Sequence, residues 1–214
     1  MKLPQLSAEE QKLFEQGIAQ VNGQAMNRTA LGIIAAFLKL YPKATFAELK
    51  EAFPDHLNPS GPKAPKTIFK PYSDRNFGVV HSEVEIKSEF DKAGLPYTGV
   101  FFLEDDEKFV TADGITVIVN RLWESKDTES GASDIQQLAN QALKYGIVVN
   151  KFEPRTPFGR GSYSIDVLNP ALFDKITKAT HVSAAKQEEK RAIPIWIWIL
   201  LISAVLGILV WNLV

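Results

Sequence analysis

The chain has 214 residues, of which 45% are hydrophobic and 23% are charged, a composition typical of one folded domain with an appendage rather than of a disordered chain. It contains no cysteine, which excludes disulfides and thiolate metal sites and agrees with a reducing compartment. The formal net charge is −1, so the chain as a whole lacks the basic excess that drives non-specific binding to nucleic acid.

The first expected element is a helix that begins after Ser7. Ser7 and Glu10 have the Ser-x-x-Glu spacing of a capping box, in which two side chains satisfy free backbone N–H groups at a helix start. The residues that follow predict a helix to about Gln20, ended by Gly23.

Two more helices are expected over 28–40 and 46–53. The first has apolar residues at helical spacing and stops at Tyr41-Pro42, because the residue before a proline avoids helical geometry. The second begins at a capping box formed by Thr45 and Glu48. Such a pair is typical of a helix-turn-helix, but TFAELKEAF carries more acidic than basic residues, so we do not expect this helix to read DNA.

Residues 56–76 differ in composition from the rest of the chain. The stretch NPSGPKAPKTIFKPYSDRN holds four prolines, which predicts a long, extended and exposed loop. Two interpretations are open: a solvated linker, or a docking surface for an anionic partner, either a protein, a nucleic acid or an anionic lipid. The binding residues in the second interpretation are Lys63, Lys66, Lys70 and Arg75.

A small antiparallel sheet is expected after this loop. A helix over 82–93 should come first, closed by Gly94. The segments 100–103 and 108–111 flank the acidic run 104–107, which predicts a hairpin with an acidic tip. Asp113-Gly114 is a strong turn dipeptide, so 115–119 should return as a third strand of one meander.

The rest of the domain is expected to mix helices and strands. Ser133 and Gln136 form a third capping box, and Gly146 should close the helix that it opens. Strands are expected over 147–152 and 163–167 with a hairpin turn over 154–161, followed by a helix from Asn169-Pro170 to about Lys178. The sequence therefore predicts an α+β domain over 1–178, with the helix pair at about 28–53, the basic loop at 56–76, and the sheet and further helices at 77–178.

The C-terminal stretch predicts a single transmembrane helix over 193–214, preceded by a polar tether over 179–191. The stretch is 22 residues long without a charge, which at ~1.5 Å per residue spans a bilayer core of roughly 30 Å. Aromatic residues near both ends suit the membrane interface, and two small residues four apart would allow close helix packing and self-association. The interface residues are Trp196, Trp198 and Trp211, and the packing residues are Ser203 and Gly207.

Basic residues before this stretch set the expected orientation. Lys186, Lys190 and Arg191 precede the apolar stretch, and the positive-inside rule then places the domain in the cytosol. The N-terminus turns polar at once and shows no signal peptide, so the anchor is expected to insert after translation, as in tail-anchored proteins. The expected location is a single-pass position in a membrane, with a bacterial inner membrane as the first choice.

A search for catalytic motifs returns little. His56, His81 and His181 form no ligand motif, and no nucleophile elbow, phosphate loop, dinucleotide-binding or zinc-protease motif is present. The acidic run 104–107 does not match a calcium loop, although Asp113 nearby could complete an acidic cluster. We therefore expect a non-enzymatic protein without cofactor or metal.

Several of these segments together resemble a known type of domain. The stretch ALGIIAAFLKLYPKATFAELKEAFPD, followed by FGVV, by FFLEDDEKFVTADGITVIVNRLWES and by the helix 135–145, is similar to a poorly characterised bacterial α+β accessory domain. This domain is found in some restriction and phage-defence proteins. The resemblance covers roughly 29–152, rests on scaffold features and carries over no catalytic residues. It implies a fold with helix-turn-helix or winged-helix character and suggests a role in defence.

The leading hypothesis is a membrane-tethered, non-enzymatic module that recruits a partner protein through the basic loop or the hairpin face. A second hypothesis is a membrane-acting effector whose anchor oligomerises and damages the bilayer. A third is a membrane-tethered nucleic-acid-binding protein, which the charge balance disfavours. The three differ in a simple way: recruitment needs only the domain, the effector needs the anchor, and nucleic-acid binding should be sensitive to salt.

Overall fold

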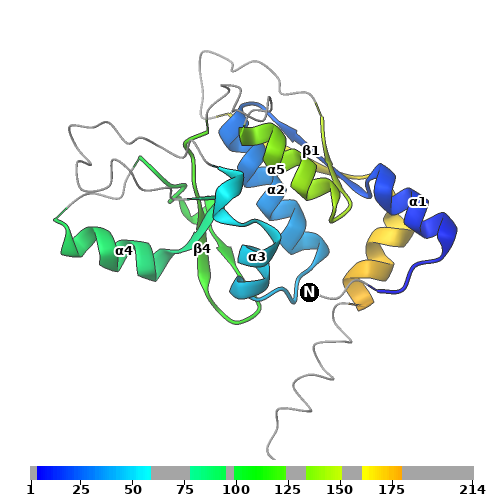
Figure 1. Cartoon of the computed structure of the whole chain (residues 1–214), viewed down its shortest axis with the longest axis horizontal. Helices are drawn as coiled ribbons and strands as arrows, with labels where there is room; N and C mark the ends of the chain where they lie inside the picture. Colours follow the sequence, from blue (N-terminus) through cyan, green and yellow to red (C-terminus); the bar gives the residue numbers. More distant parts are fainter. Residues whose placement is uncertain (1–3, 59–77, 95–98, 124–133, 151–160, 180–214) are drawn as a thin grey trace, which may run out of the picture. The chain divides into compact units, whose positions relative to one another are not determined.

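A computed structural model describes residues 4–58, 78–94, 99–123, 134–150 and 161–179 of the chain. By contacts the chain divides into two compact units, Met1–Thr180 and His181–Val214, and all described residues belong to the first. This first unit is an α+β fold with two small sheets (Figure 1), which confirms the predicted class. Among the described residues no helix is both long and apolar enough to cross a bilayer. The predicted transmembrane helix over 193–214 lies outside them, as does the tether beyond 179.

The first helix is shorter than the sequence predicted. Helix α1 (Ala8–Gln16) begins at the expected capping box, in which Ser7 and Glu10 bond to each other's backbone N–H. It ends at Gly17, whose φ of 98° is not helical. The expected helix to Gln20 is therefore wrong: the following residues form strand β1 (Ala19–Gly23), with alternating burial. Gly23 ends this strand rather than the helix.

Strand β1 is the centre of a mixed three-stranded sheet. It pairs in parallel with β5 (Ile147–Val149) and antiparallel with β6 (Tyr163–Val167), in the order β5-β1-β6. Both outer strands were expected, but the hairpin predicted between them is wrong, because β1 lies between them. The fold thus contains a mixed sheet as well as the expected antiparallel one.

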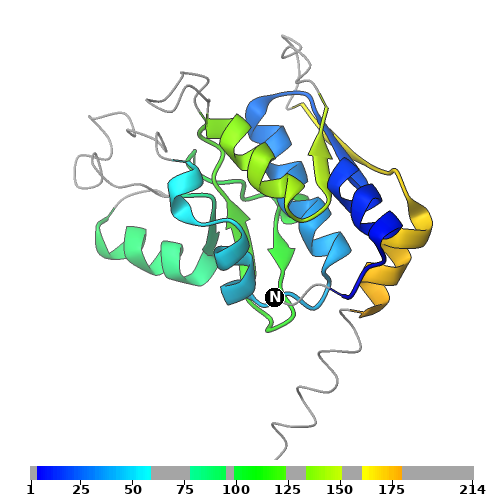
Figure 2. The same cartoon turned by 45° about the vertical axis from the view of Figure 1, so that its right-hand side comes forward.

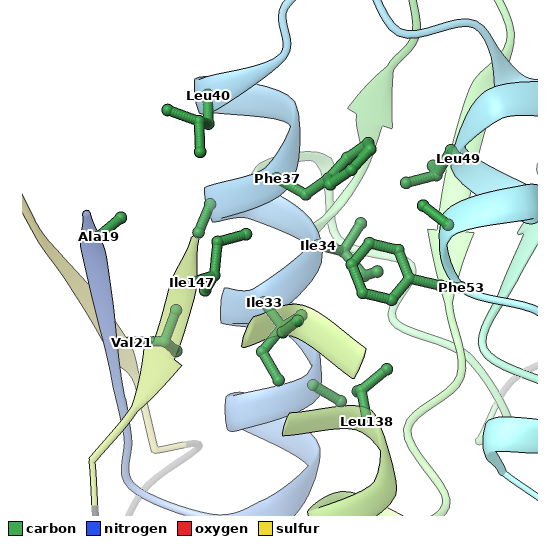
Figure 3. Close-up of a cluster of buried hydrophobic side chains, with 14 of the residues drawn as sticks. Ala19, Val21, Ile33, Ile34, Phe37, Leu40, Leu49, Phe53, Leu138 and Ile147 are labelled. Carbon is green, nitrogen blue, oxygen red and sulfur yellow. The ribbon is translucent and has the colours of Figure 1, made fainter. Parts of the chain in front are cut away.

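Helix α2 (Met26–Leu40) packs between this sheet and a second helical layer. Its buried side chains face almost every direction around its axis, which explains its continuous apolar sequence. Figure 3 shows Ile147 and Val21 on one side of α2, with Leu49 of the next helix and Phe53, which directly follows that helix, on the other. The Phe37 ring meets the Phe53 ring edge-on at 5.1 Å between centroids.

The helix pair and the helix before β5 match the prediction closely. Helix α3 (Phe46–Ala52) begins at the expected capping box, with both hydrogen bonds between Thr45 and Glu48 present. The 3-10 helix η1 (Asp55–Leu57) follows it at the start of the expected basic loop. Helix α5 (Asp134–Leu143) ends before Gly146, which has a φ of 74°. A last helix spans 170–179, close to the expected limits.

The second sheet is antiparallel, as expected, and contains the expected strands within 108–111 and 115–119, but its third strand is 80–82 rather than 100–103. Its order is β2-β4-β3, formed by Val80–Ser82, Thr116–Val119 and Phe109–Val110. Helix α4 (Glu83–Lys92) follows β2 and contacts β2 and β4. Figures 1 and 2 show α4 and the mixed sheet on opposite sides of α2.

The hairpin predicted between 100–103 and 108–111 is wrong. Phe101 bridges to Asn120, and β3 pairs with β4, so both segments lie along β4 instead of pairing with each other. The acidic residues between them form the 3-10 helix η3 (Asp105–Glu107). The turn at Asp113-Gly114 is confirmed, because Gly114 has a φ of 79° and β3 and β4 pair across it.

Candidate functional site at the base of the basic segment

The residues predicted to bind a partner or a membrane lie outside the described residues. Segment 59–77 contains the four basic candidates Lys63, Lys66, Lys70 and Arg75, and 180–214 contains the anchor candidates Trp196, Trp198, Trp211, Ser203 and Gly207. The structure does describe both residues that border the basic segment, Asn58 and Gly78. The geometry at this border shows how the segment is attached to the domain.

Buried asparagine side chains hold the two ends of the basic segment together. Asn58 Nδ2 donates to the Gly78 carbonyl at 3.3 Å and to the Leu122 carbonyl at 3.1 Å. Asn120 Nδ2 donates to the same Gly78 carbonyl at 2.9 Å. Both asparagines have an exposed fraction of 0%. Because buried carbonyls outside regular structure must find donors, these amides replace the bonds that a sheet would have supplied.

An ion pair ties the same two chain segments together at the surface. Lys50 Nζ, on α3, lies 2.5 Å from Asp55 Oδ1 and also donates to the Val80 carbonyl at 3.3 Å. Asp55 precedes the basic segment and Val80 follows it, so one lysine links both sides. We call Lys50, Asp55, Asn58, Gly78 and Asn120 the loop-base clamp.

Gly78 is the glycine of the loop-base clamp, and a side chain at this position would not fit. Its φ is +59°, a conformation that favours glycine, and a Cβ atom there would lie 2.0 Å from Asp55 Oδ1. The close approach brings the Gly78 carbonyl within reach of both amide donors. Glycine at 78 is therefore required by the loop-base clamp itself.

A second undescribed segment, 124–133, begins beside the loop-base clamp. Leu122 N–H donates to Asn120 Oδ1 at 2.9 Å, and Trp123 Nε1 donates to the Asn120 carbonyl at 2.8 Å. Trp123 is buried against the main hydrophobic core. Segments 59–77 and 124–133 thus start from the same part of the domain.

The described residues and segment 59–77 carry net charges of opposite sign. The described residues carry 18 acidic and 12 basic residues, a net formal charge of −6. Segment 59–77 carries Lys63, Lys66, Lys70 and Arg75 against Asp74, a net charge of +3. The loop-base clamp therefore holds a basic segment on an acidic domain.

A buried ion pair was not anticipated from the sequence. Arg28 Nη1 on α2 lies 2.5 Å from Glu107 Oε1, and the two residues are 8% and 6% exposed. The guanidinium also lies 4.7 Å from the centroid of the Phe102 ring. Glu107 was expected in a solvated acidic tip, but it fastens η3 to α2. Burial raises the pKa of the nearby Tyr163 hydroxyl, and the Arg28 charge opposes this rise.

The other polar candidates have structural roles in the described part of the chain. Asp113 does not complete an acidic cluster, because it accepts hydrogen bonds from Thr111 and from the Phe46 N–H. No group of three or more His, Asp or Glu that could hold a metal ion occurs among the described residues. His56 is exposed, whereas the half-buried His81 ring meets the Phe101 ring at 5.4 Å, and His181 lies outside the described residues.

The sequence pattern singled out the basic residues but not the asparagines at the base of their segment. Asn120 ends the apolar run TVIV, and a buried amide at a strand end is a weak signal for a polar network. Asn58 stands before a proline and reads as an ordinary loop residue. Their contacts join residues 20, 42 and 64 positions apart, which no local pattern reveals.

Comparison of the chain with protein-family models, with curated proteins and with solved structures gave no match.

Proposed function

We propose that this protein is a membrane-tethered, non-enzymatic recruitment module that binds an acidic partner protein through its basic segment. The observation that carries the proposal is the loop-base clamp, in which Asn58 and Asn120 both donate to the Gly78 carbonyl. Segment 59–77 is longer than most connections between elements of compact domains, and connections of such length are often functional. Here the domain uses two fully buried amides to keep the ends of such a segment at one place.

Fixing both ends of a binding segment favours association. A segment that is free at one end loses more conformational entropy when a partner orders it than one whose ends are already joined. The loop-base clamp supplies this constraint before the partner arrives. Asn58 Oδ1 is buried and has no hydrogen-bond partner among the described residues.

The charge distribution supports a partner protein over a nucleic acid. The net charge of −6 on the described residues repels phosphates that approach beyond the reach of the basic segment. A small acidic patch on a partner protein can contact the four basic side chains without contacting the acidic surface of the domain. The membrane anchor predicted over 193–214 would hold the module at the bilayer surface, where recruitment raises the local concentration of the partner.

The test is affinity purification from gently solubilised membranes, with the intact chain and with a fragment that ends at Lys186. The proposal predicts a stoichiometric protein with both forms, lost when the basic segment is neutralised by K63Q, K66Q, K70Q and R75Q together. The matched control neutralises exposed lysines of the described helices by K12Q, K87Q, K92Q and K178Q and should retain the protein.

Other outcomes would replace the proposal. Recovery of more of the same chain, and only with the intact form, would favour a membrane-acting effector. Salt-sensitive recovery of RNA or DNA through the basic segment would favour the nucleic-acid hypothesis. Binding of the intact chain to pure anionic vesicles through the four basic residues, with no protein recovered, would identify lipid as the target.

A further inference from the structure

Strand β6 is the longest edge strand among the described strands, and no described strand pairs with its outer edge. It spans five residues and pairs only with β1, whereas the other edge strands, β5, β2 and β3, have three, three and two residues. Its pairing with β1 is continuous from Gly23–Tyr163 to Ala19–Val167, without a bulge. It contains no lysine and no proline, which natural edge strands use to prevent pairing with another chain.

The hydrogen-bond pattern shows which backbone groups face outward. Leu168 N–H donates to the Ile18 carbonyl at 2.9 Å, and Gln24 N–H donates to the Ser162 carbonyl at 3.0 Å. Bonded pairs alternate along an antiparallel ladder, so Ser164 and Asp166 also direct their backbone groups towards β1. The N–H and C=O groups of Tyr163, Ile165 and Val167 therefore point away from the sheet.

We infer that β6 pairs antiparallel with β6 of a second copy of this chain, in the register that places Ile165 opposite Ile165. In this register the outward backbone groups of Tyr163 face those of Val167 in the other copy. The pairing then forms about six inter-strand hydrogen bonds, and the two mixed sheets become one six-stranded sheet. The interaction is isologous, as in most homodimers.

The side chains of β6 distinguish this register from its neighbours. With Ile165 at the centre, each exposed Ser164 lies opposite an exposed Asp166 of the second copy. Asn22 Nδ2 already donates to the Ser164 oxygen at 3.3 Å and to Asp166 Oδ2 at 2.7 Å. The Ser164 hydroxyl proton is therefore available for the opposite carboxylate. Shifting the strand in one direction would oppose Asp166 to Asp166, which is destabilising.

Apolar contacts add to the pairing. The side chains of Tyr163, Ile165 and Val167 face α2, yet all three are only half-buried because the sheet ends at β6. A second strand would cover the exposed parts of these side chains and bring Tyr163 against Val167 of the other copy. This edge is independent of the loop-base clamp, so the inference does not rest on the proposed function.

The absence of cysteine from the chain allows a direct test by disulfide crosslinking. The full chain is prepared as S164C with one tag and as D166C with another, in the same detergent-solubilised membranes, and oxidised after mixing. Directly opposite residues lie about 4.5–5.5 Å apart, within reach of a disulfide, whereas the diagonal pairs 164–164 and 166–166 lie roughly 7–8 Å apart. The inference predicts that the mixed crosslink exceeds each self-crosslink at least fivefold.

The control is D174C, an exposed position on the helix 170–179. If S164C and D166C together crosslink no more than D174C alone, or if the self-crosslinks dominate, the inference is wrong. The S203L/G207L variant blocks packing through the predicted transmembrane helix. It should leave the mixed crosslink unchanged, and loss of the crosslink in this variant would assign the contact to the anchor.

A charge swap tests the same register without cysteines. S164D opposes two carboxylates at each of two positions and should raise the dissociation constant of the dimer at least tenfold in sedimentation of the full chain. The S164D/D166S variant restores one hydroxyl opposite each carboxylate and should recover most of the affinity. In this variant Asn22 still faces one carboxylate and one hydroxyl of its own chain. Circular dichroism checks that each variant is folded. Equal dissociation constants for S164D and the swapped variant would overturn the inference.

Discussion

Asp113, in the turn between β3 and β4, caps helix α3 from 67 residues further along the chain: the Phe46 N–H donates to Asp113 Oδ1 at 3.1 Å and to Oδ2 at 3.3 Å. Thr111 Oγ1 donates to the same carboxylate at 2.6 Å. The Ala112 N–H donates to the Ala44 carbonyl at 3.0 Å beside it. The turn therefore docks the antiparallel sheet onto the start of α3, whose unsatisfied N–H groups favour a negative charge.

Replacing Asp113 should destabilise the domain in a pH-dependent way. Partial burial raises the pKa of the Asp113 carboxyl, but the hydrogen bonds from Thr111 and Phe46 outweigh this and lower it below 3.8. Stability from a lowered pKa is present above the unfolded value and is lost as the pH falls through the folded value. We expect D113N, which removes only the charge, to lower the free energy of unfolding by roughly 0.3–1 kcal/mol at neutral pH, measured by urea titration.

The difference between D113N and the unchanged chain should shrink as the pH falls below 3.8, the ordinary pKa. The matched control is D91N, on the exposed surface of α4, which should change the free energy of unfolding little at any pH. A D113N effect of the same size in acid and at neutral pH would contradict a role for the charge.

Breaking the buried pair between Arg28 and Glu107 should be among the most destabilising single changes. Removal of one partner leaves an uncompensated charge at a site that is at most 8% exposed. We expect E107A to lower the free energy of unfolding by about 3–5 kcal/mol. The control is K175A, which breaks the more exposed pair of Lys175 with Glu10 and should lower the free energy of unfolding far less than E107A does.

The same pair can be tested by replacing both partners. The R28M/E107L variant removes both charges and keeps side chains of similar size. It should therefore lose less free energy of unfolding than R28M and E107L lose when their separate losses are added. Chemical denaturation of the unchanged chain, of R28M, of E107L and of R28M/E107L gives the coupling free energy directly. Additive losses would show that the two side chains do not interact.

An alanine at Gly78 should disrupt the loop-base clamp. The new Cβ would require a left-handed backbone and would also lie 2.0 Å from Asp55 Oδ1. Gly94 is the matched control, because its φ of +65° is similar and no atom of the described residues lies within 4 Å of a Cβ there. G94A should cost about 1 kcal/mol for the backbone alone, and G78A should cost at least about 1 kcal/mol more. An equal decrease in melting temperature for the two variants would show that Asp55 moves away from the new Cβ without a cost in stability.

An alanine at Gly32 should destabilise the contact between α2 and the mixed sheet. Alanine normally stabilises a helix interior by roughly 0.5–1 kcal/mol relative to glycine. At this position the Cβ would lie 2.7 Å from Val21 Cγ1 and 3.0 Å from the Tyr163 ring. We expect G32A to lose about 1–3 kcal/mol from overpacking. The G32A/V21A variant should lose less free energy of unfolding than G32A and V21A lose when their separate losses are added. If the loss of the double variant equals that sum, the contact with Val21 is not the cause.

The helices that begin at a capping box were predictable because their signals are local. Ser7 with Glu10 and Thr45 with Glu48 satisfy backbone groups within one turn, so four consecutive residues are enough to mark the start. The turn at Asp113-Gly114 is local in the same way, since only residues that tolerate a positive φ fit there. The basic character of 59–77 is a property of composition and is read from the sequence directly.

Strand β1 and the loop-base clamp were decided by the tertiary structure alone. The residues of β1 form a strand because β5 and β6 pair with them from more than 120 positions away, whereas their sequence alone continues the pattern of α1. Phe101 likewise pairs with Asn120 rather than within the predicted hairpin. A helix satisfies its backbone hydrogen bonds within a few residues, whereas a strand or a buried amide takes its partners from wherever the chain returns. The sequence therefore determined where the capped helices begin, and the fold determined which strands and asparagines meet.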